Sequence, residues 1–415
     1  MSGSHRAFAG LRHPGYRFYL CGSMLAMMAD SIEHVISYWM LFQKFHSPAL
    51  AGFAVISHWA PFLFFSIWSG ALADRFDPRR IIQWAMAMFA TASLAWGVLF
   101  LTGRLEIWHA VAILTIHGFA GVLWNPSAQL LIHDIVGRDR LQSAVRLMSM
   151  ARTLGLLAGP AVGGAILLAL GPSHGILLNV VFYLPLALWL WRAPYGPRFR
   201  KEPPRSRPIA GLADIVATVR EMAGNHVLLS MTVVAGVSSF VVGNAYQAQM
   251  PEFAQDLGHG DAGLHYSMLL AANAAGALAG GVLLESFGLM QARPRTAFVL
   301  VALWCICIGG FAASTVYAFS VALMFAAGVC NLAFSSMSQT LVQLHAPDAS
   351  RGRMIGIYNL SSNGMRAFSG VTVGVGGSLI GIHWSLALSA AVLLAVTLGL
   401  LAGYGRRRQP AATAE

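Results

Sequence analysis

Long apolar stretches separated by short polar segments run along the whole chain, and each is long enough to cross a bilayer as a helix. The apolar windows predict six helices in the first half, near residues 17–43, 49–73, 81–102, 107–131, 143–170 and 174–192. They predict six more in the second half, near residues 226–250, 262–286, 296–314, 317–342, 354–381 and 384–404. Twelve spans would place both termini on the same side of the membrane.

A polar segment separates the two sets of helices. It begins Pro- and Arg-rich and continues, from Ile209 to Ala223, in the pattern of a short amphipathic helix lying at the membrane surface. We therefore expect four parts: an N-terminal six-helix bundle (1–192), a cytoplasmic linker with an amphipathic helix (193–225), a C-terminal six-helix bundle (226–405) and a basic cytoplasmic tail (406–415).

The two halves resemble each other weakly. An offset of 213 residues places Arg138 on Arg351, Arg140 on Arg353, Gly163 on Gly376 and Gly164 on Gly377. An offset of 211 residues places Gly70 on Gly281 and Asp74 on Glu285. Repeats of this kind are typical of transporters built from two pseudo-symmetric halves. The predicted fold class is an all-α polytopic membrane protein with twelve transmembrane helices in two six-helix halves.

Composition supports a membrane protein and locates the termini. Of 415 residues, 57% are hydrophobic and only 10% are charged, which excludes an ordinary soluble domain. The net charge of +11 is explained by the positive-inside rule, because only Lys44 and Arg104 of the 27 basic residues fall in loops expected outside. We expect a multi-pass protein of a bacterial-type inner (plasma) membrane, with both termini cytoplasmic, no cleaved signal peptide and no nucleic-acid partner. The four cysteines lie in apolar stretches and predict no metal site.

The loop after the second predicted helix reads GALADRFDPRR and resembles the cytoplasmic loop motif of the major facilitator superfamily. The resemblance implies a latch that favours the outward-facing state, with a small residue for close helix approach and an acid and arginines that bond to the opposite half. Asp77 stands where the motif has glycine, so the turn departs from the family pattern. The expected latch residues are Gly70, Asp74, Arg75, Arg79 and Arg80, with Glu285 in the weaker copy.

Two further motifs narrow the resemblance. The fifth predicted helix contains Gly155, Gly159, Pro160, Gly163 and Gly164, which resemble the motif of drug:proton antiporters in the same superfamily. In that family the motif accompanies export, with the glycines packing closely and the proline bending the helix at the seam between halves. The segment from Asn125 to Gln129 and the later Arg351-Gly352-Arg353 resemble the subgroup containing enterobactin exporters and macrolide efflux pumps.

Ionisable groups within the predicted spans are costly to bury and are therefore candidates for function. They are Asp30, Glu33, Arg152 and Arg366, and each arginine and Asp30 lies about 18–20 Å of helix rise from its cytoplasmic edge. We expect Asp30 or Glu33 to pair with Arg152, leaving the other carboxylate to carry a coupling proton. The alternative is a static salt bridge that only holds helices together.

Histidines in two other predicted spans could extend a proton relay, although a lone membrane histidine is more often a packing residue. They are His58 and His117. Together with Asp30 and Glu33 these residues would also suit a divalent metal, but no closely spaced ligand pair such as H-x-x-x-H is present, and no metal site is assigned.

The superfamily fold implies a substrate cavity lined by the first, fourth, seventh and tenth helices. Mixed aromatic and amide side chains there favour a mid-sized amphipathic ligand, although such residues also line interfaces without ligands. The candidates are Tyr38, Trp39, Trp124, Asn125, Asn244, Tyr246, Gln247, Asn331 and Gln339.

These features together predict a secondary active transporter. We expect a monomeric, proton-coupled exporter of amphipathic small molecules, such as drugs or siderophore-like metabolites, that needs no cofactor. The sequence contains no H-E-x-x-H, G-x-S-x-G or P-loop pattern, so it predicts neither an enzyme nor an ATP-driven pump. The alternatives are uptake, lipid flipping or divalent-metal export by the same fold, or a membrane receptor or scaffold without transport.

Overall fold

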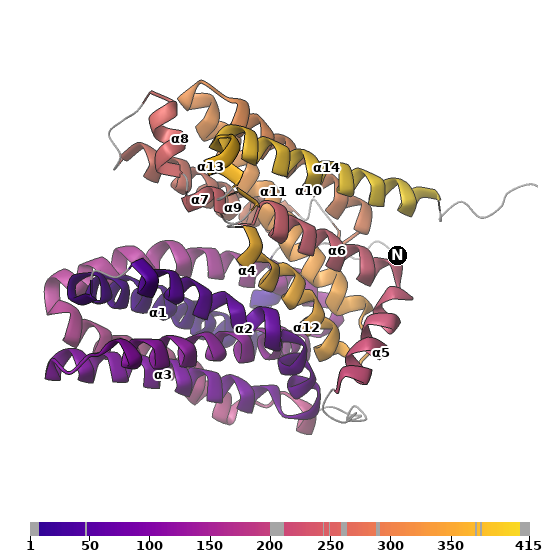
Figure 1. Ribbon diagram of the computed structural model, residues 1–415. Helices are drawn as coiled ribbons and strands as arrows, with labels where there is room; N and C mark the ends of the chain where they lie inside the picture. Colours follow the sequence, from indigo (N-terminus) through magenta and orange to yellow (C-terminus); the bar gives the residue numbers. More distant parts are fainter. Residues whose placement is uncertain are drawn as a thin grey trace, which may run out of the picture. The chain divides into compact units, whose positions relative to one another are not determined.

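The computed structural model describes residues 8–45, 48–199, 211–243, 245–248, 250–258, 264–287, 291–369, 372–373 and 376–406. Every regular element in these ranges is a helix (Figure 1). The short helix η1 (Ala9–Arg12) precedes the first long helix, and η2 (Pro197–Phe199) follows the fourth. An all-helical chain agrees with the predicted class.

The first three long helices each begin at a proline, which loses nothing there because the first N–H groups of a helix have no partner within it. They are α1 (Pro14–Phe45), α2 (Pro48–Arg75) and α3 (Pro78–Thr102). Asp77 caps α3 by accepting from the Arg79 backbone N–H at 3.0 Å, and Gly103 ends it with a positive φ of 68°. The residue that departs from the family motif is therefore a helix cap.

Helix α4 (Ile107–Arg192) contains three predicted spans. Its 86 residues would extend about 129 Å if straight, several times the thickness of a bilayer core. The backbone leaves helical geometry at Gly137 (φ 69°) and Gly171 (φ 72°), which lie in the gaps between the predicted spans. Glycine allows these two breaks because it has no Cβ. Pro160, expected to bend this region, lies inside the helix and is not one of the two breaks.

The second half is divided into more pieces than expected. Helix α5 (Leu212–Ala223) is the predicted amphipathic helix, and α6 (His226–Val241) follows it. The remainder of the predicted span 226–250 contains the short helix α7 (Ala245–Ala248), and a second short helix, α8 (Met250–Asp256), begins at its last residue. The next three helices, α9 (Leu264–Phe287), α10 (Pro294–Ala313) and α11 (Tyr317–His345), agree closely with the predicted ranges.

The helix expected over residues 354–381 is not continuous. The structure has α12 (Arg351–Ser362), then η3 (Gly364–Phe368) and the short α13 (Gly376–Ile380), before the last long helix α14 (Ile382–Arg406). The break falls at Ser361-Ser362-Asn363-Gly364, and serine, asparagine and glycine are weak helix formers.

The chain divides into two compact units. The N-terminal unit contains Phe8–Thr218 and Ala346–Leu360, and the C-terminal unit contains Val219–His345 and the chain from Ser361 onward. In the N-terminal unit α4 packs against α1, α2 and α3 around Ile32, Trp96 and Ile176. In the C-terminal unit α11 packs against α6, α9 and α10, and α10 packs against α14. Residues 346–360, expected with the C-terminal bundle, thus contact the N-terminal helices.

Several helices are long and apolar enough to cross a membrane. In the described part of the chain there are seven by length and composition, or eight if the pair bent by 108° at residues 224–225 is one span. They are Pro78–Thr102, Ile107–Pro160, Val162–Phe199, Met268–Phe287, Pro294–Ala313, Tyr317–His345 and Ile382–Gly403. The protein therefore crosses the membrane several times, and the total of twelve spans stays a prediction.

Candidate functional site

Helix α1 presents two buried acids on one face. Asp30 and Glu33 are separated by three residues, which places their side chains on the same side of a helix. Asp30 is 9% exposed and Glu33 is 2% exposed, so neither carboxylate is freely solvated. The same helix buries Ile32 and Ile36 in the core of the N-terminal unit. The apolar packing of α1 therefore holds two acids in the interior.

His117 of α4 bridges these two carboxylates. Its Nε2 lies 2.7 Å from Asp30 Oδ1, and its Nδ1 lies 2.8 Å from Glu33 Oε1. A neutral imidazole has only one N–H, so both bonds require either a protonated imidazole or a protonated carboxyl group. The three side chains therefore hold one proton more than a neutral imidazole between two carboxylates would hold. Three ionisable groups thus lie buried and in direct contact.

Polar residues from α3 and α4 hold Glu33 in place. The Ser93 hydroxyl donates to Glu33 Oε2, and Asn179 donates to Ser93 Oγ at 3.2 Å and to the Ala29 carbonyl at 2.9 Å. Ser93 and Asn179 are fully buried. These two residues are not among the predicted ones, because a single serine or asparagine in an apolar helix carries no distinctive pattern.

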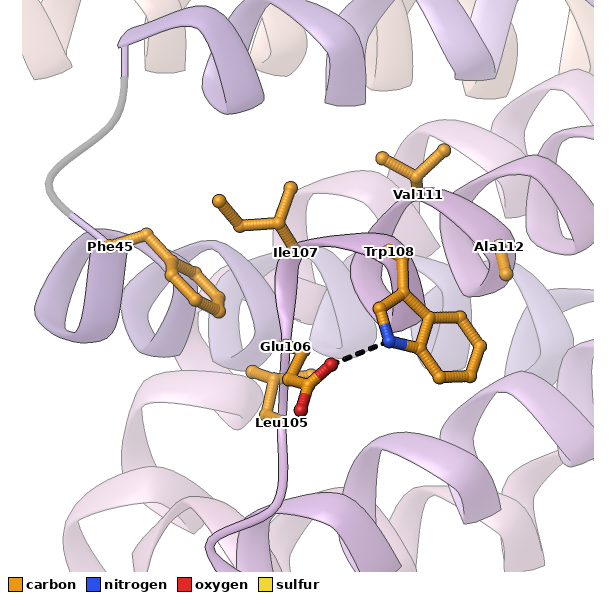
Figure 2. A pocket seen from close by; sticks show the side chains of 7 residues that line it. All are labelled: Phe45, Leu105, Glu106, Ile107, Trp108, Val111 and Ala112. Carbon is orange, nitrogen blue, oxygen red and sulfur yellow. Dashed lines mark hydrogen bonds between the residues drawn. The ribbon is translucent and has the colours of Figure 1, made fainter.

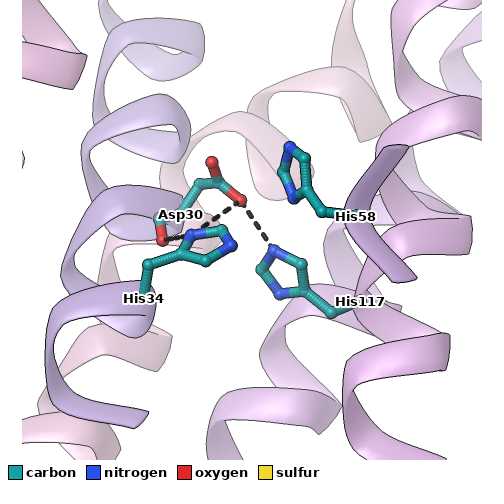
Figure 3. A group of neighbouring side chains, drawn as sticks. All are labelled: Asp30, His34, His58 and His117. Carbon is teal, nitrogen blue, oxygen red and sulfur yellow. Dashed lines mark hydrogen bonds and ion pairs between the residues drawn. The ribbon is translucent and has the colours of Figure 1, made fainter. Parts of the chain in front are cut away.

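Two more histidines complete the cluster (Figure 3). His34 of α1 lies one turn after Asp30, with its Nδ1 2.7 Å from the Asp30 carbonyl oxygen. His58 of α2 has its ring centroid 5.1 Å from that of His34 and 6.1 Å from that of His117. Three helices thus bring one acid and three imidazoles to a common centre. In the sequence, the spacing of four residues from Asp30 is the one feature that indicates His34 lies on the same helix face as that acid.

The expected pairing with Arg152 differs from the observed one. Arg152 acts on Asp30 as a nearby positive charge, but among the described side chains the direct partner of both acids is His117. His117 makes these contacts because it lies on the face of α4 that packs against Asp30 and Glu33. Arg366 lies in η3 of the C-terminal unit, so its expected place in the same layer stays a prediction.

The predicted latch motif caps a helix. Asp74 at the end of α2 accepts backbone hydrogen bonds from Gly352 at 2.6 Å and Arg353 at 2.9 Å, in the first turn of α12. A Cβ on Gly70 would overlap the Gly352 carbonyl oxygen, so only glycine allows this approach. Ile355 packs beside Ala73, and both belong to one buried cluster. These contacts lie within the N-terminal unit.

The arginines of the motif have different surroundings. Arg79 pairs with Asp77 at 2.6 Å in its own loop and donates to the carbonyl of Ala193 at the end of α4. Arg75 and Arg80 are exposed, and each lies over an aromatic ring. Glu285 is buried in α9 of the C-terminal unit. Arg79 therefore closes the loop, and Asp74 makes the contact with α12.

The glycines of the fifth predicted helix pack against α1. A Cβ at Gly155, Gly159 or Gly163 would contact residues between Met24 and Val35, and at Gly159 it would overlap the Ser31 side chain. Gly164 has no neighbour within 4 Å of such a Cβ. These three contacts lie within the N-terminal unit. The small residues there allow α4 to approach α1, the helix that carries Asp30.

The predicted cavity residues have varied environments. Trp124 and Tyr246 are buried, Trp39 is 48% exposed, and Asn244 lies outside the described residues. The others are half-buried: Tyr38, Asn125, Gln247, Asn331 and Gln339. Tyr38 packs edge-on against His34, with ring centroids 5.1 Å apart. The side chain of Tyr38 therefore borders the carboxylate–histidine cluster.

A separate pocket of about 770 Å³ lies where the segment between α3 and α4 meets the end of α1 (Figure 2). Its one polar contact among the residues drawn is the bond from Trp108 Nε1 to Glu106 Oε2, at 2.6 Å. The lining residues are Phe45, Leu105, Glu106, Ile107, Trp108, Val111 and Ala112, none of which was predicted to line the cavity.

Comparison with known proteins agrees with a transporter fold. The solved proton:xylose symporter XylE, of the major facilitator superfamily, matches with a TM-score of 0.74 at 16% identity, covering 96% of each chain. The enterobactin exporter EntS of Citrobacter koseri is 24% identical, over 96% of this chain and 94% of its own. The staphyloferrin A transporter of Staphylococcus aureus is 20% identical over 40% of this chain, a match that spans 42% of that relative.

The family match and the relatives identify a multi-pass membrane transporter of the major facilitator superfamily, and the fold agrees. The model of the transmembrane secretion effector family matches residues 5–408, and the chain belongs to that family. It is a transporter and not an enzyme, and the efflux-type resemblance seen in its motifs is confirmed at the level of the family.

Proposed function

We propose that the protein is a proton-driven exporter of amphipathic organic molecules, with both termini in the cytoplasm. The observation that carries the proposal is the bridge from His117 to Asp30 and Glu33, because three coupled groups in the bilayer interior can take up and release a proton. Secondary transporters of this fold work by alternating access around a fixed site.

Relatives support the direction and the class of cargo. A protein named as an enterobactin exporter aligns over nearly the whole chain, and another is named as a staphyloferrin A transporter. Both names refer to siderophores, which are mid-sized organic molecules. The aromatic and amide residues near the cluster, such as Tyr38, suit a ligand of that kind.

The coupling step can be described from the side chains of this protein. In one access state the cluster of Asp30, Glu33 and His117 takes up a proton from outside, and in the other it releases the proton inside. Ser93 and Asn179 keep Glu33 in the orientation that meets His117. Arg152 and the neighbouring His34 and His58 add positive charge near Asp30 when the histidines are protonated.

The test uses inverted membrane vesicles that contain the full chain. A pH gradient, acidic inside, should drive accumulation of an amphipathic cationic dye or a catechol siderophore. Asp30→Asn and Glu33→Gln should each lower the initial rate of pH-driven transport by about tenfold or more, in line with a removed proton-transfer group. Asp139→Asn, a change of an exposed acid, is the matched control.

Two results would contradict the proposal. If both cluster variants transported as fast as the unaltered protein, the cluster would be a static packing element. If uptake into right-side-out vesicles, lipid movement or divalent-metal movement were driven while organic molecules were not, the direction or the cargo would be wrong.

A further inference from the structure

We propose that Asp30, His34, His58 and His117 form a binding site for a divalent transition-metal ion such as Zn²⁺ or Co²⁺. Imidazole and carboxylate together are ligands that these ions prefer. The site lies in the N-terminal unit and is formed by α1, α2 and α4 (Figure 3). The inference does not rest on the export of organic molecules.

The four side chains are close enough to share one ion. Each offers a nitrogen or oxygen atom, and all four atoms lie within 4.8 Å of one another. Bonds from zinc to nitrogen or oxygen are about 2.0–2.2 Å and their usual geometry is tetrahedral, so two ligand atoms of one ion are about 3.3–3.6 Å apart. Side-chain rotation would have to bring the most distant ligand atoms closer by about 1.2–1.5 Å and open the 2.7 Å contact between His117 and Asp30 by somewhat less, to place all four around the same ion.

His58 supplies an independent observation, a buried ring nitrogen that no described group satisfies. Its Nδ1 is buried and has no hydrogen-bond partner in the described part of the protein. Buried polar atoms are nearly always bonded, because an unbonded one loses its interaction with water and gains nothing. The ring packs against Trp59 on one side and approaches His34 and His117 on the other. A metal ion at the centre of the cluster would give His58 a partner.

The outer contacts of the histidines also match a metal site. A metal-binding histidine usually donates its second ring N–H to a carboxylate or a carbonyl, which fixes the ring. His117 has its Nδ1 against Glu33, and His34 has its Nδ1 against the Asp30 carbonyl. The Nε2 of His117 then faces Asp30, and the other ring nitrogen of His34 points toward the same centre (Figure 3). Glu33 thus supports a ligand without being one.

The negative charges of the ligands and their partners balance the charge of a divalent cation. Asp30 would contribute one negative charge directly, and Glu33 a second through His117. The proton now shared by Asp30 and His117 would leave to solvent when the ion binds, because both atoms become ligands. Arg152 is the nearby positive charge that opposes binding.

The experiment is calorimetric titration of the purified full chain, without a histidine tag, with ZnCl₂ at fixed pH. We expect one ion per chain, with binding weakened at least tenfold by His58→Gln and by His34→Gln. His174→Gln, the same change at an exposed histidine, should leave binding unaltered. Glu33→Gln should weaken binding by about 10- to 100-fold, as is typical when the outer partner of a ligand is lost.

A second variant separates loss of a ligand from loss of fold. His58→Cys keeps a zinc-binding atom at that position, so it should retain binding that His58→Gln loses. Thermal unfolding without metal checks that each variant is folded. No zinc binding by the folded protein, or binding that His34→Gln and His58→Gln leave unchanged, would overturn the inference. Dye transport in vesicles is measured separately, so failure of the metal site and failure of the proposed export give different results.

Discussion

The carboxylate of Asp74 accepts a hydrogen bond of 2.6 Å from the backbone N–H of Gly352, 278 residues later in the chain. Its second oxygen accepts from Arg353 at 2.9 Å. The first N–H groups of a helix have no partner within it, and an acid there is stabilised by the helix dipole. Asp74 therefore supplies from α2 the cap of α12. The resemblance to a superfamily loop motif pointed to Asp74, and the structure gives its role in this unit.

Removing that cap should loosen α12. Asp74→Ala loses two hydrogen bonds to a charged acceptor, each worth about 1.5–3 kcal/mol. We expect faster hydrogen exchange at the amides of residues 352–356 and a lower thermal midpoint. Asp74→Asn keeps one acceptor oxygen and should have a smaller effect. Equal exchange at these amides in Asp74→Ala and in Asp139→Asn would contradict the capping role.

Two glycines should respond to the same substitution with opposite signs. A Cβ at Gly70 would overlap the backbone of Gly352, which cannot move aside cheaply, so Gly70→Ala should destabilise by about 1–3 kcal/mol. Gly164 has open space around the same position, so Gly164→Ala should stabilise its helix by about 0.5–1 kcal/mol. Thermal unfolding in detergent checks both. Equal shifts would mean that the close approach at Gly70 is not needed.

Gln129 and Asn359 should be energetically coupled. The Gln129 amide donates to Asn359 Oδ1 at 2.9 Å, and both side chains are buried within the N-terminal unit. A double-mutant cycle with Gln129→Leu and Asn359→Leu should give a coupling energy of about 0.5–3 kcal/mol, because Gln129→Leu removes the donor to Asn359 and Asn359→Leu leaves Gln129 only its longer bond to Asn125 Oδ1, at 3.3 Å. Additive effects would show that the hydrogen bond does not contribute.

His13 should make the protein less stable in mild acid. Partial burial and the nearby Arg140 lower the pKa of His13 below its ordinary value of 6.5. A lowered pKa in the folded state means that this contribution to stability is present above pH 6.5 and is lost as the pH falls. The thermal midpoint should therefore drop between pH 7.5 and 5.5, and less so in His13→Gln. The exposed His174→Gln should retain the full drop.

Much of the helical framework follows from local sequence. Apolar length predicted most helices within a few residues, and the gaps containing Gly137 and Gly171 were visible as polar punctuation. The spacing of Asp30 and Glu33 placed both acids on one face, because the helical repeat depends only on neighbours along the chain. The break after Ser362 was missed, since weak helix formers lowered helix propensity without interrupting the apolar pattern enough to be noticed.

The partners of those acids could not be read in the same way. His117 follows Glu33 by 84 residues, and His58 reaches the cluster from a third helix, so their distances depend on how α1, α2 and α4 pack. The hydrophobic effect is non-directional, so many arrangements of these helices would bury the same residues. Close approach at Gly155, Gly159 and Gly163 sets the part of α4 after Gly137 against α1, and packing of the part before Gly137 brings His117, rather than Arg152, onto the carboxylates. The sequence alone thus identifies the ionisable groups buried in the membrane. Which of these groups meet is decided by helix packing, because packing depends on the fit between side chains that are far apart in the chain.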